Sequence, residues 1–239
     1  MIVAAHQPHF LPWLGYLDKV RRADCFVVMD DLQYEAQNFQ NRQRVKVAIG
    51  ARWLTVPLAH ASQTATIRDR EIDNSAYGRH SWQHKHWRTL ELHYSRAPFF
   101  DRYAADLEEV FHRRWRFLID LDLRLLELAR SWLGITTPVI LASSLGATGA
   151  KTERILAVCR KLGATKYLAG TGASLDYLDV KLLERCGIDV EWHRYDHPTY
   201  VQRYPEHGFL PRLGFLDYVL NTGGERAGID IAGGSHAAA

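Results

Sequence analysis

A strand–helix–strand pattern at the start of the chain constrains its fold more than any other feature of the sequence. The apolar run 2–5 passes into a loop that contains prolines, and apolar residues then recur at helical spacing over 13–20, with Lys19 and Arg22 opposite them. A second apolar run follows at 25–29. A helix that connects two neighbouring strands makes those strands parallel. The first part of the chain is therefore predicted to contribute a parallel strand pair.

The same pattern returns in the last third of the chain. Short apolar runs at 138–142 and 166–170 flank a helical pattern at 152–162. Alternating strands and helices at both ends of a chain are typical of sheets covered by helices on their faces. We predict an α/β fold with an open, mostly parallel sheet of Rossmann-like type.

The middle of the chain carries a helical pattern instead. From residue 81 to about residue 133, large apolar residues recur at steps of three and four, with a break at Pro98. We predict a helical subdomain over 76–134, inserted into an α/β core formed by 1–75 and 135–230. Residues 231–239 are rich in Ala and Gly and are predicted to form a flexible tail.

The composition argues against several classes of protein. Hydrophobic residues make up 47% of the chain and charged residues 24%, which is typical of soluble globular proteins. With 30 Lys and Arg against 27 Asp and Glu, the net charge of +3 does not require nucleic acid or an anionic membrane as a partner. No apolar run reaches the roughly 18 residues of a membrane span, and the start lacks a signal-peptide pattern, so we expect a cytoplasmic protein. The three cysteines form no CxxC motif, and we predict no metal site.

Polar side chains follow the predicted strands at their carboxyl ends, where parallel sheets bind ligands. His6 and Gln7 follow the first strand, and together with the N-terminus of the first helix they would bind a phosphate or a carboxylate. The structural alternative is that His6 only orders a turn. Asp30 follows the second strand and is a candidate base.

The segment 33–44 is dense in amide, Arg and Tyr residues and almost free of aliphatic ones. We interpret it as a polar loop that lines the site, because Arg and Lys pair with carboxylates and phosphates. A solvated loop is the alternative. Near the end of the chain, Asp196 and His197 could form an oriented pair for general base catalysis, although a turn held by Pro198 explains them as well. Lys85 would reach a cleft or solvent from the helical subdomain.

These considerations give two sets of candidate residues. The predicted catalytic residues are His6, Gln7, Asp30, Lys85 and His197. The predicted ligand-binding residues are His9, Trp13, Tyr16, Gln33, Tyr34, Asn38, Asn41, Arg42, Lys46, Ser143, Ser144, Lys151, Gly170, Tyr200 and Gln202.

Two resemblances bear on function. The spacing of His6 and His9 resembles in part the HxGH signature of nucleotidylyltransferases, with Pro8 in place of the glycine, and Ser143, Ser144 and Lys151 loosely echo the second basic motif of those enzymes. The chain as a whole resembles the WbqC-like protein family. The segments that carry this second resemblance are 6–16, 30–34, 41–46, 53–57 and 197–202.

The family resemblance implies a role in surface-polysaccharide or natural-product biosynthesis, where amino sugars are acylated. Our first hypothesis is an amide-forming acyl- or aminoacyl-transferase that uses an activated donor, an adenylate or an aminoacyl-tRNA, and a small amine or amino-sugar acceptor. ATP or aminoacyl-tRNA is thus the expected co-substrate, and tRNA a possible partner. The alternatives are an ATP-dependent nucleotidylyltransferase and a non-catalytic protein that binds a sugar nucleotide or a partner protein.

Overall fold

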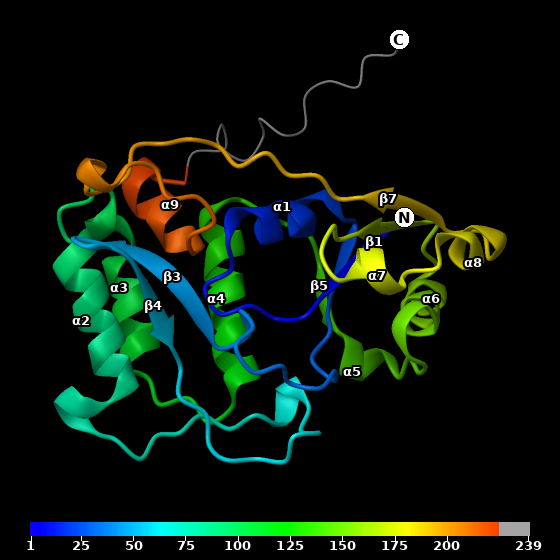
Figure 1. Ribbon diagram of the computed structural model, residues 1–239, viewed down its shortest axis with the longest axis horizontal. Helices are drawn as coiled ribbons and strands as arrows, with labels where there is room; N and C mark the ends of the chain where they lie inside the picture. Colours follow the sequence, from blue (N-terminus) through cyan, green and yellow to red (C-terminus); the bar gives the residue numbers. More distant parts are fainter. Residues whose placement is uncertain (225–239) are drawn as a thin grey trace, which may run out of the picture.

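The computed structural model describes residues 1–224, and its centre is a five-stranded sheet that is parallel throughout (Figure 1). The strands lie in the order β5-β2-β1-β6-β7. Their bounds are β1 (Ile2–His6), β2 (Cys25–Val28), β5 (Val139–Leu141), β6 (Lys166–Ala169) and β7 (Asp189–Trp192). This order confirms the predicted open Rossmann-like sheet. The direction of strand addition reverses between β1 and β6, which makes that pair the expected place for a ligand.

Helices cover both faces of the sheet, which explains why its strands are apolar runs without alternation. On one face, Val3 and Ala5 of β1 pack with Ile155 and Cys159 of α6. On the other face, Ala4 belongs to a larger cluster that includes α1 and the middle helices. The helices that flank the sheet or its loops are α1 (Leu14–Arg22), α5 (Ala142–Leu145), α6 (Lys151–Leu162), α7 (Ser174–Tyr177) and α8 (Val180–Arg185).

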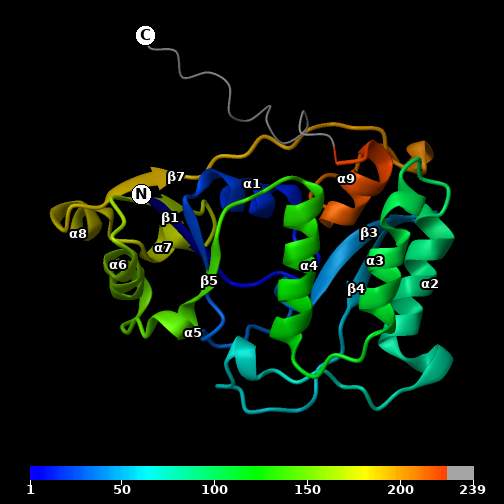
Figure 2. The same ribbon diagram turned by 180° about the vertical axis from the view of Figure 1, so that it is seen from behind.

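The rest of the described chain forms a second layer beside the sheet (Figures 1 and 2). An antiparallel hairpin, β3 (Arg42–Val47) and β4 (Gly50–Thr55), pairs only with itself. Three long helices follow it, and α9 packs on them, with a hydrogen bond from the Phe99 amide to the Leu220 carbonyl. The bounds are η1 (Ile67–Asp69), η2 (Gly78–His80), α2 (Trp82–Tyr94), α3 (Phe100–His112), α4 (Leu118–Trp132), η3 (Pro205–His207) and α9 (Phe215–Thr222).

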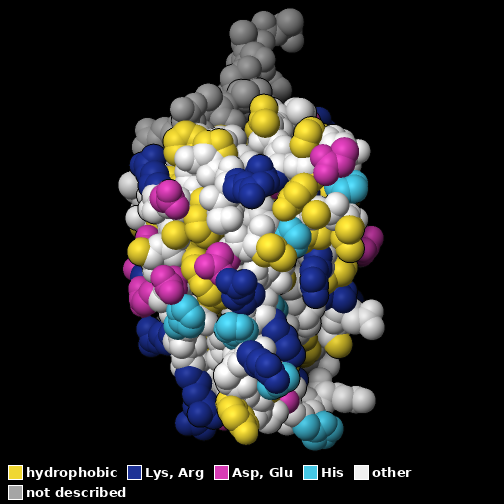
Figure 3. All heavy atoms as spheres, turned by 90° about the vertical axis from the view of Figure 1, so that its left-hand side faces the viewer, with side chains coloured by type: hydrophobic (Ala, Val, Ile, Leu, Met, Phe, Trp, Pro, Cys, Tyr) yellow, Lys and Arg dark blue, Asp and Glu magenta, His cyan; other side chains and the backbone are white. Residues whose placement is uncertain are grey.

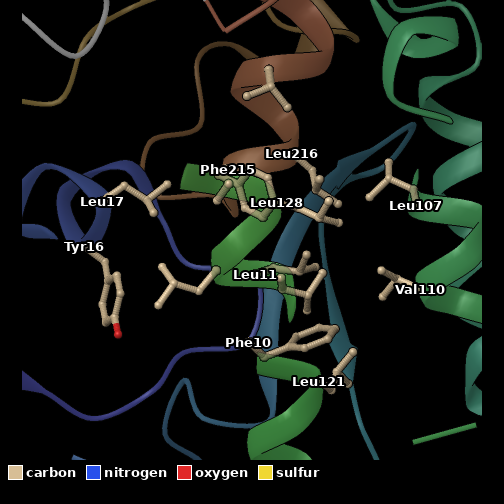
Figure 4. Close-up of a cluster of buried hydrophobic side chains, with 14 of the residues drawn as sticks. Phe10, Leu11, Tyr16, Leu17, Leu107, Val110, Leu121, Leu128, Phe215 and Leu216 are labelled. Atoms are coloured by element: carbon tan, nitrogen blue, oxygen red, sulfur yellow. The ribbon is translucent and has the colours of Figure 1, made fainter. Parts of the chain in front are cut away.

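The loop between β1 and α1 enters the main hydrophobic core. Phe10 and Leu11 have no exposed surface, and Figure 4 shows them among side chains of α3, α4 and α9. Leu11 has a positive φ of 46°, a conformation that L-residues adopt only when packing compensates its cost. The segment therefore runs through the core before α1 begins, which holds His6 and His9 at the edge of that core.

The structure differs from the sequence prediction in one segment, and one predicted segment lies outside the described residues. The final residues of the segment 33–44 are not loop, because β3 begins at Arg42. The predicted tail, 231–239, lies outside the described residues. Within residues 1–224, no helix has the length and apolar character needed to cross a membrane.

Replacing Phe10 with alanine should lower the free energy of unfolding by about 3–5 kcal/mol, because the change leaves a cavity in a closely packed core. Urea denaturation followed by circular dichroism measures the effect. The control is Tyr77→Ala, which truncates an aromatic side chain that is 86% exposed. Equal losses in the two variants would show that Phe10 does not anchor the loop.

Candidate functional site

A cavity of about 500 Å³ opens at the carboxyl ends of β1 and β6, where the strand order reverses. Its walls come from the segments that follow β1, β2 and β6 and from the start of α6. The residues that line it are Ala5, His6, Gln7, His9, Met29, Leu32, Glu35, Asn38, Phe39, Lys151, Arg154, Ile155, Tyr167, Gly170, Gly172, Ala173, Ser174 and Tyr177. Six predicted site residues are among them: His6, Gln7, His9, Asn38, Lys151 and Gly170.

His6 is the last residue of β1 and faces this cavity. Its Nδ1 lies 3.0 Å from the Gln7 carbonyl oxygen, and because a carbonyl only accepts, Nδ1 carries the proton. In the neutral ring, Nε2 is then a hydrogen-bond acceptor. Burial, and after it the charge of Lys19, lowers the pKa of His6 to about 4. The imidazole is therefore neutral at physiological pH and can accept a proton at Nε2.

His9 forms an aromatic part of the cavity wall. Its ring lies between Tyr16 and Phe39, at centroid distances of 4.8 Å and 5.5 Å, and meets the His6 ring edge to face at 4.8 Å. Burial holds the pKa of His9 well below its ordinary value. Its Nδ1 is buried and has no hydrogen-bond partner among the described residues. Tyr16 itself is buried behind the two histidines and supports them.

A network of amides fixes Glu35 at the cavity. The Glu35 carboxylate accepts hydrogen bonds from Gln7 Nε2 at 3.2 Å and from Asn38 Nδ2 at 2.7 Å. Gln40 locks the orientation of Gln7 by donating from Nε2 to Gln7 Oε1, while its own Oε1 accepts from the Glu35 amide. Sequence reasoning missed Glu35, although it is the only carboxylate in the segment 33–44. The network gives the cavity one acidic group in a fixed position.

The basic groups of the cavity come from α6. Lys151 is the first residue of the helix and is exposed, and Arg154, one turn further on, forms an ion pair with Asp31. No side chain caps this N-terminus, so its first N–H groups remain available to an anion. The loop before it needs Gly149, whose φ is +98° and where a Cβ would come within 3.0 Å of the Glu153 side chain.

The sequence predicts that the N-terminus of the first helix binds the anion. The structure places that N-terminus away from the cavity. Helix α1 begins after Trp13, which lines a separate surface hollow together with His197 and Arg212. In that hollow Trp13 stacks on His197, and the His197 Nε2 accepts a hydrogen bond from the Arg212 amide. The helix N-terminus at the cavity is that of α6. Trp13 and His197 therefore do not lie with His6.

Asp30 and the two serines stand beside the cavity but do not line it. The Asp30 carboxylate is 1% exposed and accepts hydrogen bonds from the Ser143 amide at 2.9 Å and the Ser143 hydroxyl at 2.6 Å. Ser144 donates to the Leu141 carbonyl. These contacts fasten the end of β2 to α5. Asp30 therefore has a structural role, and its carboxylate does not line the cavity.

Four candidate residues from the segment 33–44 interact with other protein groups and do not line the cavity. Asn41 donates to the Val56 carbonyl, and Gln33 donates to the Gln63 carbonyl. The other two, Arg42 and Tyr34, lie in cation–π contacts, Arg42 over Trp53 at 4.6 Å and Tyr34 under Arg70 at 4.7 Å. The expectation that Arg42 shares the cavity with His6 does not hold.

Lys46, Tyr200 and Gln202 belong to a closed network around the buried Asp217. The Asp217 carboxylate accepts from Tyr94 at 2.7 Å, Tyr200 at 2.9 Å and Gln202 at 2.8 Å. Lys46 Nζ donates to Gln202 Oε1 and to the Gly208 carbonyl. Burial raises the pKa of Asp217, and the three hydrogen bonds oppose that rise. The network joins β3, α2, α9 and the segment between β7 and α9, so it holds the second layer together.

Lys85 lies on the outer face of α2, away from the cavity. Figure 3 looks onto this end of the molecule and shows Lys, Arg and His side chains gathered over its lower half. Lys85 is exposed and does not line the cavity.

The fold and the cavity define an α/β protein with a cavity at the strand crossover of a parallel sheet. The chain belongs to the WbqC-like protein family, which it matches over residues 7–229. It is also similar to the uncharacterized protein Rv1507c of Mycobacterium tuberculosis, with 34% identity over 226 residues, 93% of this chain and 94% of that protein. No solved structure matches the chain significantly.

Acidification should destabilise the protein between about pH 6.5 and pH 4, because His6 has a pKa of about 4 when folded and near 6.5 when unfolded. The unfolded state binds more protons in this window, so stability is present above it and is lost as the pH falls. His6→Asn should reduce the loss between pH 7.5 and 4.5 by about 2–3 kcal/mol. Urea denaturation at both pH values measures it, with the exposed His112→Asn as control. The same loss in all three proteins would contradict the assignment.

Asp217→Asn should cost about 2–3 kcal/mol of stability, because the new amide N–H₂ faces hydroxyl and amide donors that the carboxylate had accepted from. Thermal and urea unfolding measure the loss. Asp101→Asn, on the exposed start of α3, is the matched control and should change stability by about 0.5 kcal/mol or less. A loss no larger than that of the control would contradict a structural role for the network.

Proposed function

We propose that this protein transfers an acyl or aminoacyl group from an activated donor to a small amine or amino sugar and so forms an amide. The observation that supports this is the set of groups around one cavity: a neutral imidazole, a fixed carboxylate and a lysine at an open helix N-terminus. Amide formation needs these three tasks, which are proton removal, amine binding and anion binding.

The donor's anionic group binds at the start of α6. The Lys151 ammonium and the uncapped N–H groups of the first turn attract a phosphate, such as that of an acyl adenylate or of the 3′ end of an aminoacyl-tRNA. The Asp31 carboxylate holds Arg154, whose guanidinium adds N–H donors to the same wall. Phe39 and Tyr177 offer aromatic surface to the planar part of such a donor.

The acceptor's amine binds near Glu35, whose carboxylate attracts an ammonium group. After the ammonium has lost one proton to solvent, its nitrogen attacks the donor carbonyl carbon. The nitrogen then passes a second proton to Nε2 of the neutral His6, and the bond from the carbonyl carbon to the leaving oxygen breaks. The leaving group takes that electron pair, and the low pKa of His6 lets the imidazolium release its proton readily.

Nucleotidyl transfer from ATP would use the same basic wall. The two reactions differ in their products, because nucleotidyl transfer releases pyrophosphate and transfer from a preactivated donor does not. A non-catalytic protein would bind the donor without turning it over. Incubation with ATP, an acyl adenylate or aminoacyl-tRNA, and a panel of amines, with detection of amide, pyrophosphate and free donor by mass spectrometry, separates the three.

Lys151→Ala should weaken binding of a non-hydrolysable acyl-adenylate analogue by about 10-fold, equivalent to about 1.4 kcal/mol, because it removes a charge that the phosphate contacts. Glu35→Gln should leave that affinity unchanged and raise the KM for the amine by about 10-fold. Isothermal titration and steady-state kinetics measure the two effects.

Lys85→Ala is the matched control for Lys151→Ala, since it removes an exposed lysine on another face. It should bind the analogue as the wild type does. Equal losses at Lys85 and Lys151 would contradict the placement of the donor, and amide formation that survives intact in His6→Asn would contradict the proton transfer.

A further inference from the structure

Lys19 is a buried cation behind the cavity that the proposed reaction does not use. It comes from α1, is 3% exposed, and its Nζ donates a hydrogen bond to the Ala5 carbonyl at 2.9 Å. Ala5 is both a residue of β1 and part of the cavity wall. The ammonium therefore lies at the carboxyl end of the central strand, next to His6.

No carboxylate among the described residues forms an ion pair with Lys19. The neighbouring Asp18 is occupied by His193, at 2.7 Å, and by Arg21, at 2.9 Å. The single hydrogen bond to Ala5 leaves two of the three donors of an ammonium unused in the contacts of residues 1–224. A buried charge in this condition lowers stability, and a hydrophobic side chain of similar length would be cheaper.

Gly170, a residue of the cavity wall, lies close to this ammonium. The glycine follows β6 and lines the cavity, and a Cβ at this position would stand 3.5 Å from Lys19 Nζ. Its φ lies outside the left-handed region, so backbone conformation does not require a glycine here. Because Gly170 has no side chain, no Cβ lies against Lys19 Nζ on this side, at the crossover between β1 and β6.

We propose that Lys19 binds an anionic oxygen group of the ligand, a phosphate or a carboxylate, which enters between His6 and Gly170. The proposal rests on the cavity being the substrate site of the proposed function, and it adds a second anion subsite to the one at Lys151. The ligand then carries two anionic groups, one for each subsite. Alternatively, it carries one anionic group, and a second oxygen becomes negatively charged during the reaction.

The site also makes anion binding dependent on pH. Burial lowers the pKa of Lys19 to about 7 in the free protein. His6 and His9, beside β1, interact electrostatically with Lys19, and Asp18 on its own helix is paired with His193 after β7. The pKa of His6 lies near 4, below the window from pH 6 to pH 8. Loss of the Lys19 proton across that window should weaken the binding of an anion whose own charge does not change.

Sulfate and acetate are suitable probes, because both keep a fixed charge from pH 6 to pH 8 and they represent the tetrahedral and planar anions. Isothermal titration of the full chain, at constant ionic strength in chloride, gives the affinities. We expect the wild type to bind one of the two anions with an affinity that falls about 10-fold per pH unit above pH 7. Lys19→Met should bind that anion at least 10-fold more weakly and lose this pH dependence.

Two further variants keep the test decisive. Gly170→Ala places a methyl group in front of the ammonium and should weaken binding while Lys19 stays in place. Lys151→Ala should retain the steep pH dependence. Lys19→Met should unfold without ligand at a temperature no lower than the wild type, because it removes a buried charge.

Each outcome has a definite meaning. If sulfate binds in a Lys19-dependent way, the subsite takes phosphate, and if only acetate does, it takes carboxylate. Binding that depends on Lys151 but not on Lys19 or Gly170 overturns this inference and leaves the proposed function standing. Binding that depends on Lys19 but not on Lys151 supports the inference, and the titration of Lys151→Ala with the acyl-adenylate analogue tests the donor site of the proposed function separately. A less stable Lys19→Met that binds both anions normally, or a wild type that binds neither, overturns the inference.

Discussion

The burial of Phe10 and Leu11 is the constraint on which the site depends. Because the chain leaves β1 and passes directly into the core, His6 and His9 are held at the core's edge with their rings in contact, and Gln7 is turned toward Glu35. The same path places α1 several residues further along, so its N-terminus cannot stand at the end of β1. The helix that supplies an open N-terminus to the cavity is α6 instead. The burial of Phe10 and Leu11 thus determines which polar groups lie together at the cavity.

The strands of the sheet and the residues at their ends could be predicted because two general rules apply to them. Strands buried on both faces are continuous apolar runs, and ligand residues of parallel sheets follow the carboxyl ends of strands. These rules place His6, Gln7 and Gly170 correctly at the cavity. They do not distinguish side chains that bind a ligand from side chains that bind each other. Lys46 and Gln202 are 156 residues apart in the chain, and no local pattern shows that they form a hydrogen bond.

Lys19 shows a different limit of sequence-based prediction, because the pattern predicts an exposed side chain and the structure buries it. On α1 it lies opposite the apolar stripe, among basic residues, and such a pattern indicates a solvated face. The helix is in fact covered on a second side, where the segment after β7 brings His193 against Asp18 and Tyr195 against Trp13. Coverage by a segment about 175 residues away cannot be read from the helix itself. Glu35 could not be predicted for a related reason. Its fixed position at the cavity depends on hydrogen bonds from the Gln7 and Asn38 amides, which the sequence does not show.

The cluster around Asp217 and the groups at the cavity differ in how completely their polar atoms are paired. Around Asp217 each donating side chain has at least one acceptor within the cluster, so the free energy of those hydrogen bonds goes into holding α2, α9 and β3 together. At the cavity, Nε2 of His6, Nδ1 of His9 and Nζ of Lys19 keep hydrogen-bonding capacity that no neighbour among residues 1–224 takes up in full. Unsatisfied polar groups in a buried setting lower stability. Under the proposed function, a ligand that pairs with these groups would recover that free energy on binding, so the groups that lower stability would strengthen ligand binding.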